Sequence, residues 1–202
     1  TVIVISPSHA EYFPGISIYY GEAYETPLGL VEIAQQMVNK LVENSKIIFR
    51  GIQGHRKEHA LEVQIPFLQS VLKDFKIVPI VMGDQGRMFV DELAERISKV
   101  VNDETLVVAS SDMSHFYSSE EADRLDSVVE KRINDFDFEQ LLRDLDDHKC
   151  EACGGGPIAV MMKAASLKNI NKSFVINRSD SGDVTGDKSE VVGYLSAVIY
   201  SD

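Results

Sequence analysis

The first nine residues, Thr1-Val-Ile-Val-Ile-Ser-Pro-Ser-His9, join a run of β-branched side chains to a polar loop that ends in a histidine. Four consecutive apolar residues, 2–5, predict a strand that is buried on both faces, as is typical of parallel sheets. In an open α/β sheet, ligands bind at the carboxyl ends of the strands. His9 therefore lies where a functional site is expected.

Short β-branched runs recur along the chain and alternate with amphipathic stretches. We predict further strands over residues 47–49, 77–82, 106–109, 174–177 and 191–200, and we leave 6–29 irregular. Helical spacing of apolar residues predicts helices over 31–41, 61–72, 89–100 and 125–133, and a fifth from Pro157 to Ala165. This order predicts a three-layer α/β fold, with a central, mostly parallel sheet and helices on both faces.

Composition limits the partners of the protein. The 202 residues carry a net charge of −12 and contain no internal repeat or linker, so we predict a single domain over residues 1–202. This acidity disfavours nucleic acid, and no apolar stretch is long enough to span a membrane, so neither is an expected partner. Two cysteines and the lack of a secretory signal predict a cytoplasmic location.

Polar loops that follow predicted strands hold most of the chemically competent residues. Besides His9, these are His55 and His59 before the second predicted helix, and Asp112 and His115 after the strand at 106–109. A neutral imidazole binds Zn, Fe or Cu, or acts as a base, and a carboxylate three residues away can orient it. For any single histidine, the alternative is a polar residue that is hydrogen-bonded to a loop carbonyl group.

Cys150 and Cys153 have C-x-x-C spacing, which suggests a redox pair or a zinc site. The pair lies late in the chain, and no second pair of zinc ligands follows it. Cys153 directly precedes a glycine-rich helix start, which suits a thiolate ligand, whereas we interpret Cys150 as an inert buried thiol. The sequence contains neither a G-x-x-x-x-G-K-[ST] pattern nor a strand-linked G-x-G-x-x-G pattern, so we expect no nucleotide cofactor. The loop residues alone therefore suggest, as the most specific hypothesis, a site for a single metal ion.

Six segments of the sequence, in order, resemble motifs of the Memo-like family, which is similar in fold to the class III extradiol ring-cleaving dioxygenases. The matching segments are Ser6-Pro7-Ser8-His9, YETPLG at 24–29, EHALE with QIPF at 58–67, IVPIVMG at 77–83, SSDMSH at 110–115, and ACG with GPI at 152–158. They run from Thr1 almost to the C-terminus.

The resemblance implies a role for individual residues. It implies that His9 and Cys153 bind an iron or copper ion, that His115 is a catalytic acid or base with Asp112 in the same pocket, and that His59 lies near the substrate. Imidazole and thiolate donors favour Cu, Zn or Fe over Mg or Ca. The family has a further histidine in an upstream Pro-His-Ala-Gly-Tyr motif, which this chain lacks. We expect a segment upstream of Thr1 to supply it, and this chain alone to bind metal weakly.

Two functional hypotheses follow. The first is a metal-dependent redox enzyme related to the class III extradiol dioxygenases, acting on a small molecule. The alternative is a non-catalytic binding or adaptor protein that uses the same cleft for a peptide or a phosphate-bearing ligand. The sequence does not separate them, because a vestigial site and a working site have the same ligand types. A thiol–disulfide oxidoreductase that uses Cys150 and Cys153 is the least favoured alternative.

Overall fold

The structure, a computed structural model, describes residues 1–201 and falls into two compact units. Unit 1 comprises Thr1–Ser110, and unit 2 begins at Ser111. Both units combine strands with helices, so the predicted α/β class is confirmed. The single domain over residues 1–202 stays a prediction. No helix in the described part of the chain is long and apolar enough to cross a membrane.

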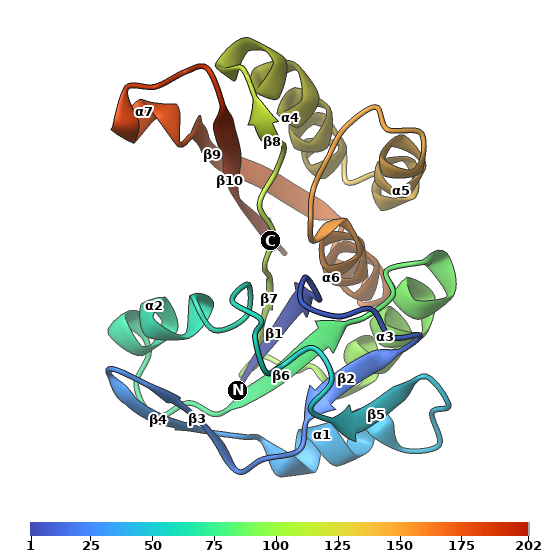
Figure 1. The fold of residues 1–202 in the computed structure, drawn as a ribbon. Helices are drawn as coiled ribbons and strands as arrows, with labels where there is room; N and C mark the ends of the chain where they lie inside the picture. The colour runs from blue at the N-terminus through green and yellow to red at the C-terminus, as the bar shows by residue number, and fades with distance from the viewer. Residues whose placement is uncertain (202) are drawn as a thin grey trace. The chain divides into compact units, whose positions relative to one another are not determined.

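Unit 1 is built on a five-stranded sheet with the order β5-β2-β6-β1-β7 (Figure 1). The strands are β1 (Val2–Pro7), β2 (Ile16–Tyr19), β5 (Ile48–Gly51), β6 (Ile77–Met82) and β7 (Leu106–Ala109). β1 runs parallel to β6 and β7, and β2 runs parallel to β5, whereas the β2–β6 pair is antiparallel. Every residue of β1 and β6 is buried, as their uninterrupted apolar runs predict. The mostly parallel sheet is therefore confirmed, consistent with a three-layer α/β fold.

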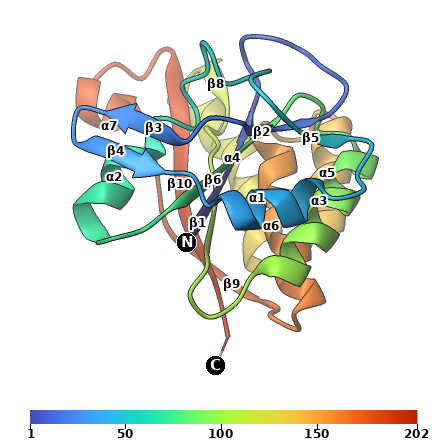
Figure 2. The ribbon, with the colours of Figure 1, turned by 90° about the horizontal axis from the view of Figure 1, so that it is seen from below.

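The helices of unit 1 are α1 (Gln35–Val42), α2 (Gln64–Val71) and α3 (Arg87–Val100). Figure 2 shows α1 and α3 side by side. Each helix buries an apolar face, with Val38 and Leu41 on α1 and Leu93 and Ile97 on α3. Arg96 of α3 donates hydrogen bonds to two carbonyl groups at the C-terminal end of α1. These bonds join the two helices and satisfy acceptors that a helix end leaves unpaired.

The prediction that 6–29 is irregular was wrong. This segment contains β2, which lies inside the main sheet, and a hairpin formed by β3 (Ala23–Thr26) and β4 (Gly29–Glu32). Each of these strands has only four residues, which is too short for a clear period-two pattern. β2 is instead fixed by tertiary pairing with strands on both sides, and such pairing is not visible in local sequence.

Unit 2 has its own antiparallel sheet, of order β8-β10-β9, and four helices. Its strands are β8 (His115–Tyr117), β9 (Lys172–Asp180) and β10 (Val191–Tyr200), and its helices are α4 (Ser119–Asn134), α5 (Phe138–Asp146), α6 (Gly155–Leu167) and α7 (Gly182–Thr185). The predicted strands at 174–177 and 191–200 thus belong to a separate sheet. Helix α6 begins two residues before the predicted start, with Pro157 third in its first turn, where no intrahelical N–H bond is lost.

Candidate functional site

Three side chains of unit 1 form a cluster that could hold a metal ion. His9 lies two residues beyond the end of β1, and Glu58 and His59 lie in the segment that precedes α2. One ligand atom from each of the three falls within 4.8 Å of the other two. The rings of His9 and His59 are stacked, with centroids 5.2 Å apart. This histidine cluster therefore offers two imidazoles, the ligand type that Zn, Cu and Fe share.

Glu58 fixes the orientation of His9. Its side chain is 1% exposed, and its Oε1 lies 2.9 Å from His9 Nδ1. The same oxygen accepts the backbone N–H groups of His59 and Ala60, and Oε2 accepts the backbone N–H of His9. Because an ionised carboxylate only accepts, Nδ1 of His9 must carry the proton. Nε2 of His9 then keeps its lone pair, which is the arrangement found at many metal-binding histidines.

The charge on Glu58 is stabilised by these contacts. Burial acts to raise the pKa of Glu58, but the hydrogen bonds from the side chain and backbone of His9 and from the backbone of Ala60 outweigh it and hold the pKa below its usual range. Both oxygens are already occupied, so Glu58 acts as an orienting residue rather than as a ligand. Sequence reasoning missed this role. The available signal was its place beside His59 in the motif at 58–67, but nothing local showed that the side chain is buried.

His59 is held less tightly than His9. Its side chain is 67% exposed, and its Nδ1 lies 3.8 Å from Glu58 Oε1, too far for a hydrogen bond. Stacking on His9 is its main side-chain contact in the cluster. The family resemblance predicts that His59 lies near the substrate, and the structure brings it beside the predicted metal ligand His9. An exposed imidazole at this position could contact either a metal ion or a substrate.

In unit 2, the backbone ties Cys153 to Asp112. The Asp112 N–H donates to Cys153 Sγ at 3.1 Å, and the Cys153 N–H donates to the Asp112 carbonyl at 3.1 Å. Ser111 Oγ lies 3.9 Å from Sγ and accepts the N–H of Gly154. Sequence reasoning therefore identified residues that do meet, although they are far apart in the chain.

The Cys153 thiol differs from the thiolate expected at a helix start. Burial raises the pKa of Cys153, and the hydrogen bond from the Asp112 N–H only partly opposes this effect. The thiol is therefore protonated at neutral pH, and a metal ion would have to displace its proton. Burial also raises the pKa of Cys150, to about 11, which agrees with its interpretation as an inert thiol.

His115 and Asp112 lie together, as their spacing predicts. Nε2 of His115 is 3.6 Å from Oδ2 of Asp112, and both side chains are partly exposed. This distance is too long for a hydrogen bond, so the two side chains make only a loose contact. The pair leaves His115 accessible to a ligand and does not lock its ring in one orientation.

Two residues that sequence reasoning missed hold the loop between Asp112 and His115. Buried Asp126 of α4 accepts the Ser114 N–H at 3.0 Å. Gly193 of β10 exchanges backbone hydrogen bonds of 2.9 Å with Met113 and Ser114. A Cβ atom at Gly193 would lie 1.8 Å from Asp126 Oδ2, so only glycine fits there. Neither residue has a local sequence signal, because both act through contacts across unit 2.

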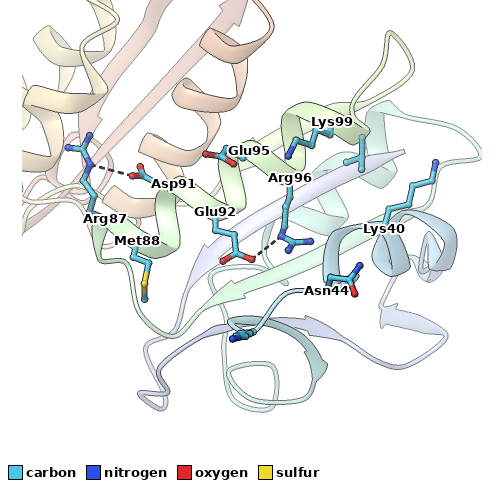
Figure 3. Close-up of a pocket in the computed structure, with 11 residues that line it drawn as sticks. Lys40, Asn44, Arg87, Met88, Asp91, Glu92, Glu95, Arg96 and Lys99 are labelled. Carbon is cyan, nitrogen blue, oxygen red and sulfur yellow. Dashed lines mark hydrogen bonds and ion pairs between the residues drawn. The ribbon is translucent and has the colours of Figure 1, made fainter.

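Unit 1 also has a groove between α1 and α3. It has a volume of about 1000 Å³ and is lined by charged side chains such as Lys40 and Lys99 (Figure 3). Ion pairs cross the surface of α3, with Arg96 Nε 3.0 Å from the Glu92 carboxylate. Among the described residues that line the groove, none is a predicted site residue. We interpret it as a solvated, salt-bridged helix surface.

Comparison with known proteins supports the family resemblance of the sequence. The family model described as Memo-like protein matches residues 1–198. A MEMO1 family protein of Methanobrevibacter smithii is 34% identical over 97% of this chain and 71% of its own. Those of Thermoplasma volcanium and Sulfolobus acidocaldarius are 37% and 38% identical, again over 97% of this chain and over 72% and 70% of their own. The chain therefore belongs to the Memo-like family.

Proposed function

We propose that this chain is a metal-dependent redox protein, related to the class III extradiol dioxygenases, that uses an iron or copper ion. One observation carries the proposal: buried, ionised Glu58 holds Nδ1 of His9, so that Nε2 is preorganised as a metal ligand. His59 stacks beside it and offers a second imidazole. The donor types fit iron, copper or zinc better than magnesium or calcium.

Other residues have supporting roles in this proposal. Cys153 stays a predicted thiolate ligand, as the family resemblance implies, once its proton has been displaced. His115 would hold or move a proton at Nε2, close to the Asp112 carboxylate. When bound, the metal ion would supply one-electron or oxygen chemistry to a small-molecule substrate. A reducing cytoplasm, which suits two thiols, is part of the same proposal.

Elemental analysis of anaerobically purified protein tests the metal site. We expect iron or copper that is lost in His9→Ala and reduced in Cys153→Ala, with both variants folded by circular dichroism. His148→Ala is the matched control, because it removes an exposed imidazole outside the cluster. Folded protein that holds no metal and refuses added iron, copper and zinc would contradict the proposal. Unchanged metal content in His9→Ala would also contradict it.

A second candidate is a binding protein without turnover, and the partial exposure of His115 and Asp112 favours it. In that case, the partly exposed side chains of His115 and Asp112 would contact a peptide or a phosphate-bearing ligand. Titration with a phosphopeptide, followed by calorimetry, tests this function. We expect saturable binding that His115→Ala weakens, and an absence of saturable binding would exclude this candidate.

A further inference from the structure

Two residues that the proposed function leaves unused meet in unit 1. Tyr24 belongs to the motif at 24–29 and lies on β3, and His55 lies in the loop that follows β5. The Tyr24 hydroxyl is 2.7 Å from His55 Nδ1, and both residues are partly buried. This is a short hydrogen bond between a phenol and an imidazole.

The backbone fixes the direction of that hydrogen bond. His55 Nε2 lies 3.3 Å from the carbonyl oxygen of Ser17 on β2. A carbonyl only accepts, so Nε2 carries the ring proton, and the lone pair of Nδ1 accepts the Tyr24 O–H. Burial lowers the pKa of His55 to about 4 and raises the pKa of Tyr24 above its ordinary value. Both groups are therefore neutral at physiological pH, with the phenol proton directed at a vacant nitrogen.

Aromatic rings connect this pair to the surface. The Tyr19 ring lies edge-on to Tyr24, with centroids 5.0 Å apart, and 5.5 Å from the His55 ring. Tyr20, which is 57% exposed, lies 5.8 Å from Tyr19. The rings of Tyr24, Tyr19 and Tyr20 thus form a continuous path from the partly buried pair to solvent. Rings at such separations are close enough for electron transfer in steps.

We infer that Tyr24 and His55 form a redox-active pair in which Tyr24 gives up one electron while its proton moves to His55. A one-electron oxidant takes an electron from the Tyr24 ring, the O–H bond breaks, and an N–H bond forms at Nδ1. The products are a neutral tyrosyl radical at Tyr24 and an imidazolium at His55. The Nε2–H of that imidazolium still donates its hydrogen bond to the Ser17 carbonyl oxygen. The charge of the pair rises by one, which matches the electron lost.

The reverse step restores both residues. A one-electron reductant such as ascorbate returns the electron, along the path through Tyr19 and Tyr20, and the proton goes back to the phenol. If the histidine cluster holds iron or copper, that ion would be a suitable one-electron oxidant. Only this choice of oxidant rests on the proposed function. The pair itself needs no metal to be tested.

Tyr12 provides a matched comparison. It also donates a hydrogen bond, of 3.0 Å, but to the carboxylate of Asp84, and its side chain is 74% exposed. A radical at Tyr12 would face solvent and be quenched rapidly. A radical at Tyr24 would be shielded, and its proton would remain nearby on His55. The lifetime of the radical therefore distinguishes Tyr24 from Tyr12.

Electron paramagnetic resonance tests the inference on the full chain after chelator treatment. Photogenerated tris(bipyridine)ruthenium(III) serves as the oxidant, and samples are frozen at increasing times. We expect a persistent tyrosyl signal in the wild type and in Tyr12→Phe, and its loss in Tyr24→Phe. In His55→Gln, the amide still accepts the hydrogen bond but cannot take up the proton, so the signal should be lost or decay much faster.

A second measurement uses only the wild type and does not depend on the folding of any variant. Because a proton moves with the electron, radical formation should be slower in deuterated water. A persistent signal that survives in Tyr24→Phe, an undiminished lifetime in His55→Gln, or equal rates in the two solvents would overturn the inference. The resonance experiment uses an added oxidant and metal-free protein. Its result therefore does not depend on whether His9→Ala loses metal, and the inference and the proposed function can fail separately.

Discussion

The histidine cluster of unit 1 and the Cys153 loop of unit 2 hold their functional groups in opposite ways. In the cluster, one buried side chain, Glu58, accepts the bonds that position His9. In the loop, backbone N–H and carbonyl groups hold Cys153 against Asp112, and the Asp112 side chain stays partly exposed. The cluster presents a lone pair that is ready to bind, whereas the loop presents a protonated thiol. The two regions should therefore respond differently to substitution and to pH.

The largest expected effect is that of Glu58→Ala. The substitution leaves three backbone N–H groups and the Nδ1–H of His9 without their buried acceptor. We expect the free energy of unfolding to fall by about 3 kcal/mol or more, and any metal affinity to fall by about 10- to 100-fold. Urea denaturation with metal titration measures both. Glu58→Gln keeps the shape of the side chain and should lose less stability, and a change below about 0.5 kcal/mol in Glu58→Ala would contradict the role of Glu58.

Acid should weaken unit 1 through His55. The folded state keeps His55 neutral, because burial lowers its pKa to about 4, whereas the unfolded chain takes up a proton below about pH 6.5. The stabilising contribution is therefore complete above pH 6.5 and is lost as the pH falls to about 4, with a loss of at most about 3 kcal/mol. Urea midpoints between pH 7 and pH 4 measure it. His55→Gln should flatten this part of the profile, and an unchanged slope would contradict the assignment.

Gly193→Ala should have an intermediate effect, confined to unit 2. Its Cβ would collide with Asp126, which accepts the Ser114 N–H, so the loop that carries Asp112 must shift. We expect a loss of about 2 kcal/mol, as for other substitutions that overpack a buried site, and faster alkylation of Cys153. Urea denaturation and iodoacetamide kinetics check these outcomes. Gly186→Ala separates overpacking from backbone strain, because no atom lies within 4 Å of its added Cβ but its φ of +80° strains any residue other than glycine.

The fold and the candidate site could be predicted from the sequence only in part. Long apolar runs at β1 and β6 predicted their strands, because burial on both faces leaves a strong local signature. The four-residue strand β2 forms by pairing with β6, and Glu58 acts by contacting His9. Both features depend on partners far along the chain, so the local sequence does not predict them. The positions of His9, Asp112, His115 and Cys153 could be proposed from loops and motifs. The residues that orient them could not, because Asp126 and Gly193 act through tertiary contacts alone.

The smallest effect should be that of Asp112→Asn, and it sharpens the contrast with Glu58. Asp112 holds Cys153 through its own N–H and carbonyl groups, which the substitution keeps. Its side chain forms only the loose, exposed pair with His115, so stability should change by less than about 0.5 kcal/mol. The Asp112 charge raises the pKa of the Cys153 thiol, so its removal should make alkylation modestly faster. A large loss of stability would mean that side chains hold the loop as they hold the histidine cluster, and the contrast between the regions would fail.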